Sequence, residues 1–179
     1  MAEEPRYCMR DAGSSPNDTE FVAAAFDSTL PCLASIGCGE MWGKVPLSEK
    51  DGFLEETRVS IEQPESYRQT GVGGEIQVFV AEVGVGTTCP DELKETNVQT
   101  RVCEDGEIRP SVAAASADDR EDAGEHAYVE FMVADHRTGK YHKGAGAALL
   151  QHMQQYYRNK GFNAMYVDAR ADNGRKLVE

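Results

Sequence analysis

The stretch Tyr141-His142-Lys143-Gly144-Ala145-Gly146-Ala147-Ala148-Leu149-Leu150 carries most of the structural information in this chain. An apolar run at 128–133 predicts a strand before it, and apolar residues at helical spacing predict a helix after it, ending at Lys160-Gly161. A helix that begins at such a turn presents free backbone N–H groups and the positive end of its dipole. Glycines at 144 and 146 permit positive φ and let an anion approach the main chain. The sequence therefore predicts a site for a phosphate-bearing cofactor.

This stretch resembles motif A of the GNAT superfamily of acyl-CoA-dependent N-acetyltransferases, written Arg/Gln-x-x-Gly-x-Gly/Ala. The run 143–150 matches its glycines and the Ala-Leu-Leu that opens its helix. A second predicted strand at 164–168 continues the likeness, as does Asn173, placed like the asparagine that opens the family's next helix. The resemblance covers about residues 126–179. It implies an α/β fold with a mixed, mostly antiparallel central sheet flanked by helices.

Three features depart from the family pattern. Tyr141 stands where Arg or Gln is usual, and the connection 134–143 is longer than the common one. The sequence ends at Glu179, inside the helix expected near Asn173, so the predicted fold is C-terminally incomplete and lacks the family's last two strands. An unfinished sheet edge favours pairing into a homodimer. The family's general acid is a tyrosine beyond the position of Asn173, and Tyr166 and Tyr141 are the phenols available instead.

The resemblance implies transfer of the acetyl group of acetyl-CoA to a primary amine, on a small molecule or a peptide, by direct attack on the thioester. Backbone N–H groups of the glycine turn would hold the pyrophosphate, and a backbone N–H of the preceding strand would polarise the thioester carbonyl. Asn173 would either bond to the pantetheine arm or only cap the last helix. The implied cofactor-binding residues are Met132, Val133, Lys143, Gly144, Ala145, Gly146, Ala147 and Asn173.

A base must remove a proton from the amine, directly or through water. Glu130 is the first candidate, because strand alternation places it with Met132 on one face and Val129 with Phe131 on the other. Desolvation among apolar neighbours would raise the pKa of this carboxyl towards a useful range. Alternatively, Glu130 is ion-paired or lies on a wet face of the sheet. The candidate catalytic residues are Glu130, Asp135 and His136.

The acceptor site is expected at a glycine-rich loop that contains Trp42, the only tryptophan of the chain. In the resembling family this region lines the acceptor pocket, so Glu40 and Trp42 are candidate substrate contacts. An indole face beside a carboxylate suits a cationic amine. Alternatively, Trp42 fills the core under a long loop, and His136 is a solvent-facing loop residue. The four histidines are scattered without cysteine partners at zinc spacing, so no metal site is predicted.

Composition limits the remaining classes. A length of 179 residues suits one domain, 1–179, and a net charge of −13 argues against nucleic acid as a partner. No apolar run approaches the length of about 18 residues needed for a membrane span, and the N-terminus does not resemble a signal peptide. Five cysteines, odd in number and without Cys-x-x-Cys spacing, indicate reduced thiols. These observations predict a cytoplasmic protein without a membrane partner.

The remaining elements are predicted from local patterns. Ser15 is the expected N-cap of a helix with Pro16 at its first position, and Pro31 is expected to end or kink that helix. A polar helix follows at 47–63. Strands are expected at 7–10, 75–83, 98–103 and 108–115, and a mobile acidic loop at about 117–125.

Two other functions fit parts of the pattern. A catalytically silent acyl-CoA-binding module would use the same cradle without turnover. An NAD(P)-binding oxidoreductase would need a third glycine, which falls at Leu149, and a shorter turn than the one from Val133 to Gly144. Asp168 does lie about where a ribose-binding carboxylate would be.

Overall fold

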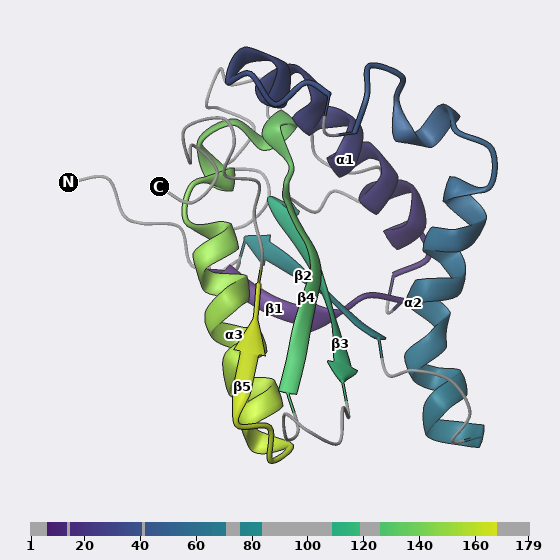
Figure 1. Cartoon of the computed structure of the whole chain (residues 1–179), viewed down its shortest axis with the longest axis vertical. Helices are drawn as coiled ribbons and strands as arrows, with labels where there is room; N and C mark the ends of the chain where they lie inside the picture. The colour runs from purple at the N-terminus through teal and green to yellow at the C-terminus, as the bar shows by residue number, and fades with distance from the viewer. Residues whose placement is uncertain are drawn as a thin grey trace, which may run out of the picture.

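The computed structural model describes residues 7–13, 15–40, 42–70, 76–83, 109–118 and 126–167, with the backbone alone at 63–70 and 117–118. This part of the chain forms a central sheet with helices packed on both of its faces (Figure 1). The elements are β1 (Tyr7–Asp11), α1 (Asp18–Ser35), the 3₁₀ helix η1 (Leu47–Glu49), α2 (Phe53–Thr70), β2 (Ile76–Val83), β3 (Ser111–Asp118), β4 (His126–Ala134), the 3₁₀ helix η3 (His136–His142), α3 (Ala145–Asn159) and β5 (Ala164–Tyr166).

The strands form one sheet in the order β1-β2-β3-β4-β5. The first four pair antiparallel with their neighbours, and β4 pairs parallel with β5. A parallel pair needs a crossover connection, which η3 and α3 provide between β4 and β5. This arrangement confirms the predicted mixed, mostly antiparallel sheet with flanking helices.

Each face of the sheet carries its own apolar core. On one face, α1 and α2 pack over Val78, Val80 and Val112, with Phe21, Val22 and Phe26 supplied by α1. On the other face, α3 packs through Leu149, Met153 and Tyr157 against small residues, including a row of alanines on β3 and β4. The alanines let α3 lie close to the sheet, which fixes the start of α3 relative to the end of β4.

A β-bulge in β4 changes the expected alternation. Ala114 pairs with Phe131 and Ala115 with Val129, so Glu130 is an extra residue without an opposite partner on β3. Val129 consequently lies in the core on the α3 side, whereas Phe131 packs against the core on the α1 and α2 side. The prediction that Val129 and Phe131 share one face was wrong. The bulge reverses the faces of all residues that follow it in the strand.

Helix α1 differs from the prediction at both ends. It begins at Asp18 with Asn17 as its N-cap, because the Asp18 carboxylate accepts hydrogen bonds from the backbone N–H groups of Gly13 (2.8 Å) and Ser15 (3.3 Å) and holds them outside the helix. Pro31 does not end the helix, which continues to Ser35. The continuation buries Leu33, and this burial offsets the hydrogen bond that proline cannot donate.

Two predicted segments can be only partly compared. The expected strand 98–103 lies outside the described residues. The expected strand 108–115 is present as β3, displaced to Ser111–Asp118. Residues 117 and 118, predicted as the start of the acidic loop, therefore belong to this strand. None of the helices in the described ranges is long and apolar enough to cross a membrane.

Candidate cofactor and acceptor site

The glycine turn opens α3 as an anion cradle. Gly144 is the N-cap in the left-handed conformation, with φ at 87°. The first N–H bonded into the helix is that of Ala148, which donates to the Gly144 carbonyl at 3.0 Å. The N–H groups of Ala145, Gly146 and Ala147 therefore have no acceptor within the helix and point beyond its end. Lys143 instead donates its N–H to the Lys140 carbonyl at 3.3 Å, so its backbone does not contribute a donor to the cradle.

The two glycines of the turn serve different purposes. Only Gly144 needs positive φ; Gly146 is already helical, so the expectation of positive φ was right for Gly144 alone. A Cβ added to Gly146 would lie 3.6 Å from the Met132 Sδ atom, an ordinary contact. The protein itself would therefore accept alanine at 146. The motif that this stretch resembles also has glycine or alanine at this position, so only a side chain larger than alanine is expected to crowd a ligand at the turn.

Tyr7 on β1 fixes the turn from outside α3. Its hydroxyl lies 2.7 Å from the Lys143 carbonyl oxygen and 3.1 Å from that of Tyr141, both of which can accept its proton. The same ring lies 3.9 Å from the Cβ position of Gly144. The sequence placed Tyr7 only within a short strand at 7–10, because nothing local indicates a contact across more than 130 residues.

The long connection before the turn is the 3₁₀ helix η3, interrupted at Gly139 (φ 57°). The rings of His136 and His142 lie 4.8 Å apart, one at each end of η3. Partial burial lowers the pKa of His136, the charge of His142 lowers this pKa further, and Asp135 opposes both effects. His142 Nδ1 is buried and has no hydrogen-bond partner within the described part of the chain. His136 is thus half-buried rather than solvent-facing.

Hydrogen bonds from Arg137 hold the Asp135 side chain in place. The side chain is buried, and its two carboxylate oxygens accept from the Arg137 guanidinium at 2.8 and 2.6 Å. It also accepts from the Arg137 backbone N–H at 2.9 Å, which caps η3. These bonds give Asp135 a structural task that competes with any role as a base.

Glu130 lies on the exposed side of the bulge. Its carboxylate accepts a hydrogen bond from the Ser116 hydroxyl at 2.5 Å on the neighbouring strand. The expectation that Glu130 sits among apolar neighbours was wrong, and the alternative of a wet sheet face describes it better. An exposed carboxylate at this point can reach an amine through water.

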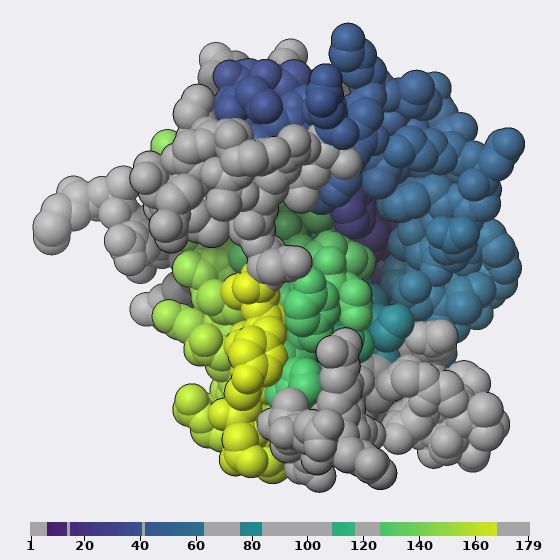
Figure 2. Space-filling model, in the orientation of Figure 1, coloured from purple at the N-terminus to yellow at the C-terminus, as the bar shows by residue number. Residues whose placement is uncertain are grey.

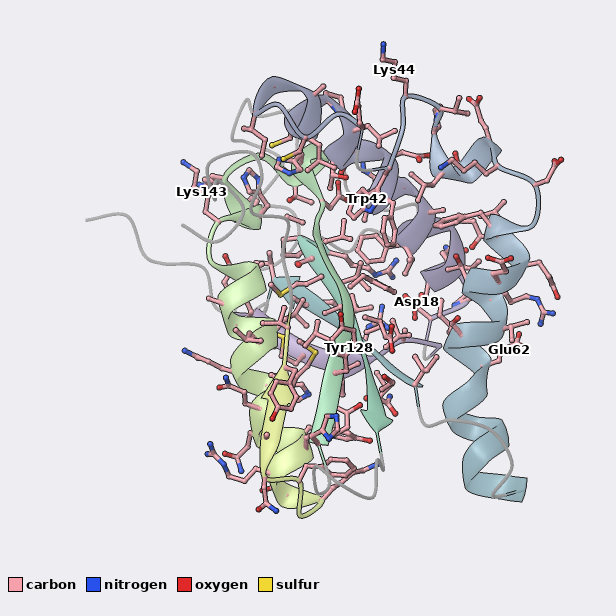
Figure 3. All side chains as sticks on the ribbon, viewed as in Figure 1. Asp18, Trp42, Lys44, Glu62, Tyr128 and Lys143 are labelled. Carbon is pink, nitrogen blue, oxygen red and sulfur yellow. The ribbon has the colours of Figure 1, made fainter. Side chains whose placement is uncertain are left out.

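Trp42 belongs to an aromatic cluster over the sheet. Its ring lies 5.0 Å from that of Phe26, which also contacts Phe53 at 5.7 Å and Phe131 at 5.0 Å, all in tilted or edge-on geometry. Figure 3 shows Trp42 near the sheet and Lys143 at the opposite side, beside the start of α3. This packing agrees with the alternative in which Trp42 fills the core. Glu40 is exposed.

An apolar pocket of about 180 Å³ adjoins this cluster. Its floor is formed by Val22, Phe26, Ile61, Val78 and Phe131, and α2 contributes Glu56, Thr57 and Ser60 at its polar side. In Figure 2, α2 and β4 border a depression with α1 at its floor. The sequence predicted the apolar residues of α1 and α2 but gave no signal that their packing leaves a cavity.

The strand β4 separates the pocket from the cradle. Phe131 lines the pocket on the α1 and α2 side, while Met132, 41% exposed, lies against the glycine turn on the other side. Strand β5 pairs with β4 only at His126, Ala127 and Tyr128 and ends at Tyr166. Within the described residues, the edge of 129–134 that faces away from β3 has no strand partner.

Two further predictions concern Asn173 and metal binding. Asn173 lies outside the described residues. Among the residues that the structure does describe, no group of three or more metal-ligating side chains comes together.

Comparisons with known proteins agree on the fold. No protein-family model matches the sequence, and no curated protein matches it significantly. A variant of the BH1408 protein from Bacillus halodurans superposes with a TM-score of 0.57 at 12% identity, over 95% of this chain and 87% of that one. AAC(6')-Iy, in a complex with the bisubstrate analogue CoA-S-monomethyl-acetylneamine, superposes with a TM-score of 0.53 at 14% identity, over 96% and 85%.

A third matched structure is a GNAT family acetyltransferase from Staphylococcus aureus, with 9% identity over 94% of this chain and 90% of that one and a TM-score of 0.49. Of these three neighbours, AAC(6')-Iy and the Staphylococcus aureus protein are described as acetyltransferases. At such identities the likeness shows the fold alone. The chain has a GNAT-like α/β fold.

Proposed function

We propose that this chain transfers the acetyl group of acetyl-CoA to a primary amine. The observation that carries the proposal is that two features lie side by side. The N–H groups of Ala145, Gly146 and Ala147 form an anion cradle at the start of α3, and Met132 beside that cradle belongs to the edge of β4 that has no strand partner within the described residues. A ligand with a pyrophosphate and a thioester arm would occupy both.

Each part of the site has a task in this reaction. The cradle binds the pyrophosphate through backbone N–H groups and the helix dipole. A backbone N–H near Met132 or Val133, on the open edge of β4, stabilises the negative charge that develops on the thioester oxygen. The amine attacks the carbonyl carbon in its neutral form, so a base takes one proton from it. Asn173 is proposed as a contact of the pantetheine arm.

Two residues remain as candidates for the base. Exposed Glu130 would act through a water molecule. His136 is the second candidate, because its lowered pKa keeps the imidazole neutral and able to accept a proton near pH 7. Asp135 is the weakest of the three predicted residues, because Arg137 occupies both of its oxygens.

Calorimetric titration with acetyl-CoA tests the cofactor, with NAD and NADP as controls. We expect one-to-one binding of acetyl-CoA alone, with a Kd in the micromolar range, about −8 kcal/mol. Binding of NAD or NADP instead of acetyl-CoA would replace the proposal with a dinucleotide-binding function. An absence of binding to all three would contradict the cradle.

A catalytically silent acyl-CoA-binding protein is the second candidate. The contacts of the two acidic candidate bases favour this second function. Glu130 is exposed and hydrogen-bonded to Ser116, and Asp135 is hydrogen-bonded to Arg137. Release of free CoA thiol in the presence of a panel of amines distinguishes the two. Amine-dependent release supports the enzyme, and acetyl-CoA binding without release supports the silent module.

A further inference from the structure

We infer that the pocket between α1, α2 and β4 holds the body of the acceptor, and that the acceptor carries a second cationic group beyond an apolar segment of about six carbons. This inference rests on the proposed function, because it names the acceptor class for the same reaction. A linear diamine with six methylene groups is the simplest molecule of this class.

The floor of the pocket selects an apolar segment. Val22, Ile61 and Val78 are buried aliphatic residues, and the rings of Phe26, Phe53 and Phe131 complete the lining. An apolar cavity of about 150 Å³ is large enough for a benzene ring, so the 180 Å³ here accommodates a six-carbon group. A fully polar acceptor such as a sugar would leave its hydroxyl groups without partners against this floor.

The α2 side of the pocket selects a hydrogen-bond donor. The Thr57 hydroxyl donates to the Phe53 carbonyl at 2.8 Å, and the Ser60 hydroxyl donates to the Glu56 carbonyl at 2.9 Å. Because these protons are committed to the helix backbone, both oxygens face a ligand as acceptors only. The Glu56 carboxylate adds a third acceptor and a negative charge. This set of three acceptors matches an ammonium group, which has only donors to offer.

The position of the pocket gives the two ends of the acceptor different surroundings. Phe131 lines the pocket, and the next residue, Met132, lies against the cradle, so one end of the pocket borders the strand edge where the thioester would lie. Glu56, Thr57 and Ser60 are on α2, across the pocket from that strand. An amine that reaches β4 therefore leaves its far end on α2. The net charge of −13 also favours the approach of a dication.

Binding in the absence of acetyl-CoA tests this inference without any requirement for catalysis. The probes are 1,6-diaminohexane and 1-hexanol, which have the same apolar segment; the alcohol carries no ammonium group that could pair with Glu56. Trp42 is the only tryptophan and contacts Phe26 at the pocket, so its fluorescence reports occupancy and calorimetry gives the Kd. We expect the diamine to bind about fivefold tighter than the alcohol, the gain of one partly exposed charge pair.

Glu56→Gln and Glu62→Gln form a matched pair of variants. Both remove one exposed carboxylate from α2 and change the net charge equally, but Glu62 is paired with Arg58 and does not line the pocket. Glu56→Gln should remove the advantage of the diamine, and Glu62→Gln should preserve it. Equal affinities for both probes in the unaltered protein, or a diamine advantage that survives Glu56→Gln, would overturn the inference. The inference would also be overturned if neither probe bound to the protein.

The two proposals fail separately. Glu56-dependent diamine binding by a protein that does not bind acetyl-CoA would leave the pocket assigned and remove the acetyltransferase. Conversely, acetyl-CoA binding with turnover of other amines, and no Glu56-dependent diamine binding, would keep the enzyme and remove this acceptor class. In an active enzyme, Glu56→Gln should lower kcat/KM for the diamine about fivefold and leave the Kd of acetyl-CoA unchanged.

Discussion

At the scale of single residues, Gly146 is a position where a larger side chain is expected to affect a bound ligand more than the fold of the protein. Its backbone is helical, and an added Cβ would meet only the Met132 side chain at ordinary distance. Gly144, with φ at 87°, is constrained by its own backbone and would suffer from any substitution. Gly146 is therefore the cleaner place to examine the cradle.

Gly146→Val should change the stability of the protein by less than about 1 kcal/mol, because valine is no worse in a helix than glycine and the added Cβ meets Met132 at ordinary distance. The larger side chain crowds the path of the pyrophosphate, so the affinity for acetyl-CoA should fall about tenfold or more, about 1.4 kcal/mol. Urea unfolding and calorimetric titration measure the two effects. Gln151→Ala, an exposed change on the same helix, serves as the control. Unchanged affinity in Gly146→Val would remove the cradle assignment.

His136 gives a prediction about pH. Its pKa lies below the usual 6.5, first because of desolvation and then because of His142. The unfolded chain therefore binds more protons than the folded one between the two pKa values, and the stability should rise with pH across that window. The penalty is complete below the folded pKa and absent above about 6.5. His142→Gln should raise the pKa of His136 without restoring it fully, as followed by NMR titration. An unmoved pKa would show that His142 exerts no charge effect.

At the scale of elements, β1 and the glycine turn depend on each other through Tyr7. Tyr7→Phe keeps the ring beside Gly144 and removes the proton shared by the Lys143 and Tyr141 carbonyls. We expect a loss of stability of about 1 kcal/mol and weaker binding of acetyl-CoA, because the turn loses its outside support. Tyr166→Phe, at a 53% exposed position, is the control and should change neither quantity. A loss of stability without any change in binding would limit Tyr7 to a packing role.

The elements also show where sequence patterns were sufficient. Helix α3 and its turn were predicted because glycines, apolar spacing and a strand-like run all lie within one continuous segment. The bulge at Glu130 was missed because it is a property of the pairing with β3, not of β4 alone. The continuation of α1 through Pro31 was missed for a similar reason: the compensating burial of Leu33 comes from tertiary packing. The contact of Tyr7 with the turn had no local signal at all.

At the scale of the whole molecule, a charged network joins three strands to the start of α1. Arg10 on β1 pairs with Asp18 at 2.7 Å and with Glu82 on β2, and Glu82 lies 3.5 Å from buried Arg109 before β3. Arg109 also lies over the Phe21 ring, 5.7 Å from its centre. The network was not predicted, because its members are ordinary surface residue types far apart in the sequence.

Asp18→Asn should destabilise the fold by about 3 kcal/mol, because it leaves the Arg10 charge partly buried with one partner fewer. Glu20→Gln, an exposed change in the same turn of α1, should remain within about 0.5 kcal/mol of the original stability. Denaturant unfolding compares the two. A cost for Asp18→Asn no larger than that of its control would show that the network contributes nothing to stability.

The bond from Tyr7 to the glycine turn also has a consequence for the order of folding. Strands β2, β3 and β4 pair antiparallel with their neighbours in sequence, and contacts between nearer segments form earlier than contacts between distant ones. The Tyr7 contacts span 134 and 136 residues, so the loop that they close is among the last to be closed. During synthesis, β1 leaves the ribosome before the segment that completes the cradle and can contact it only after that segment has been made. Cofactor affinity in a refolding experiment would therefore appear after the secondary structure, and would mark the moment at which the two distant segments meet.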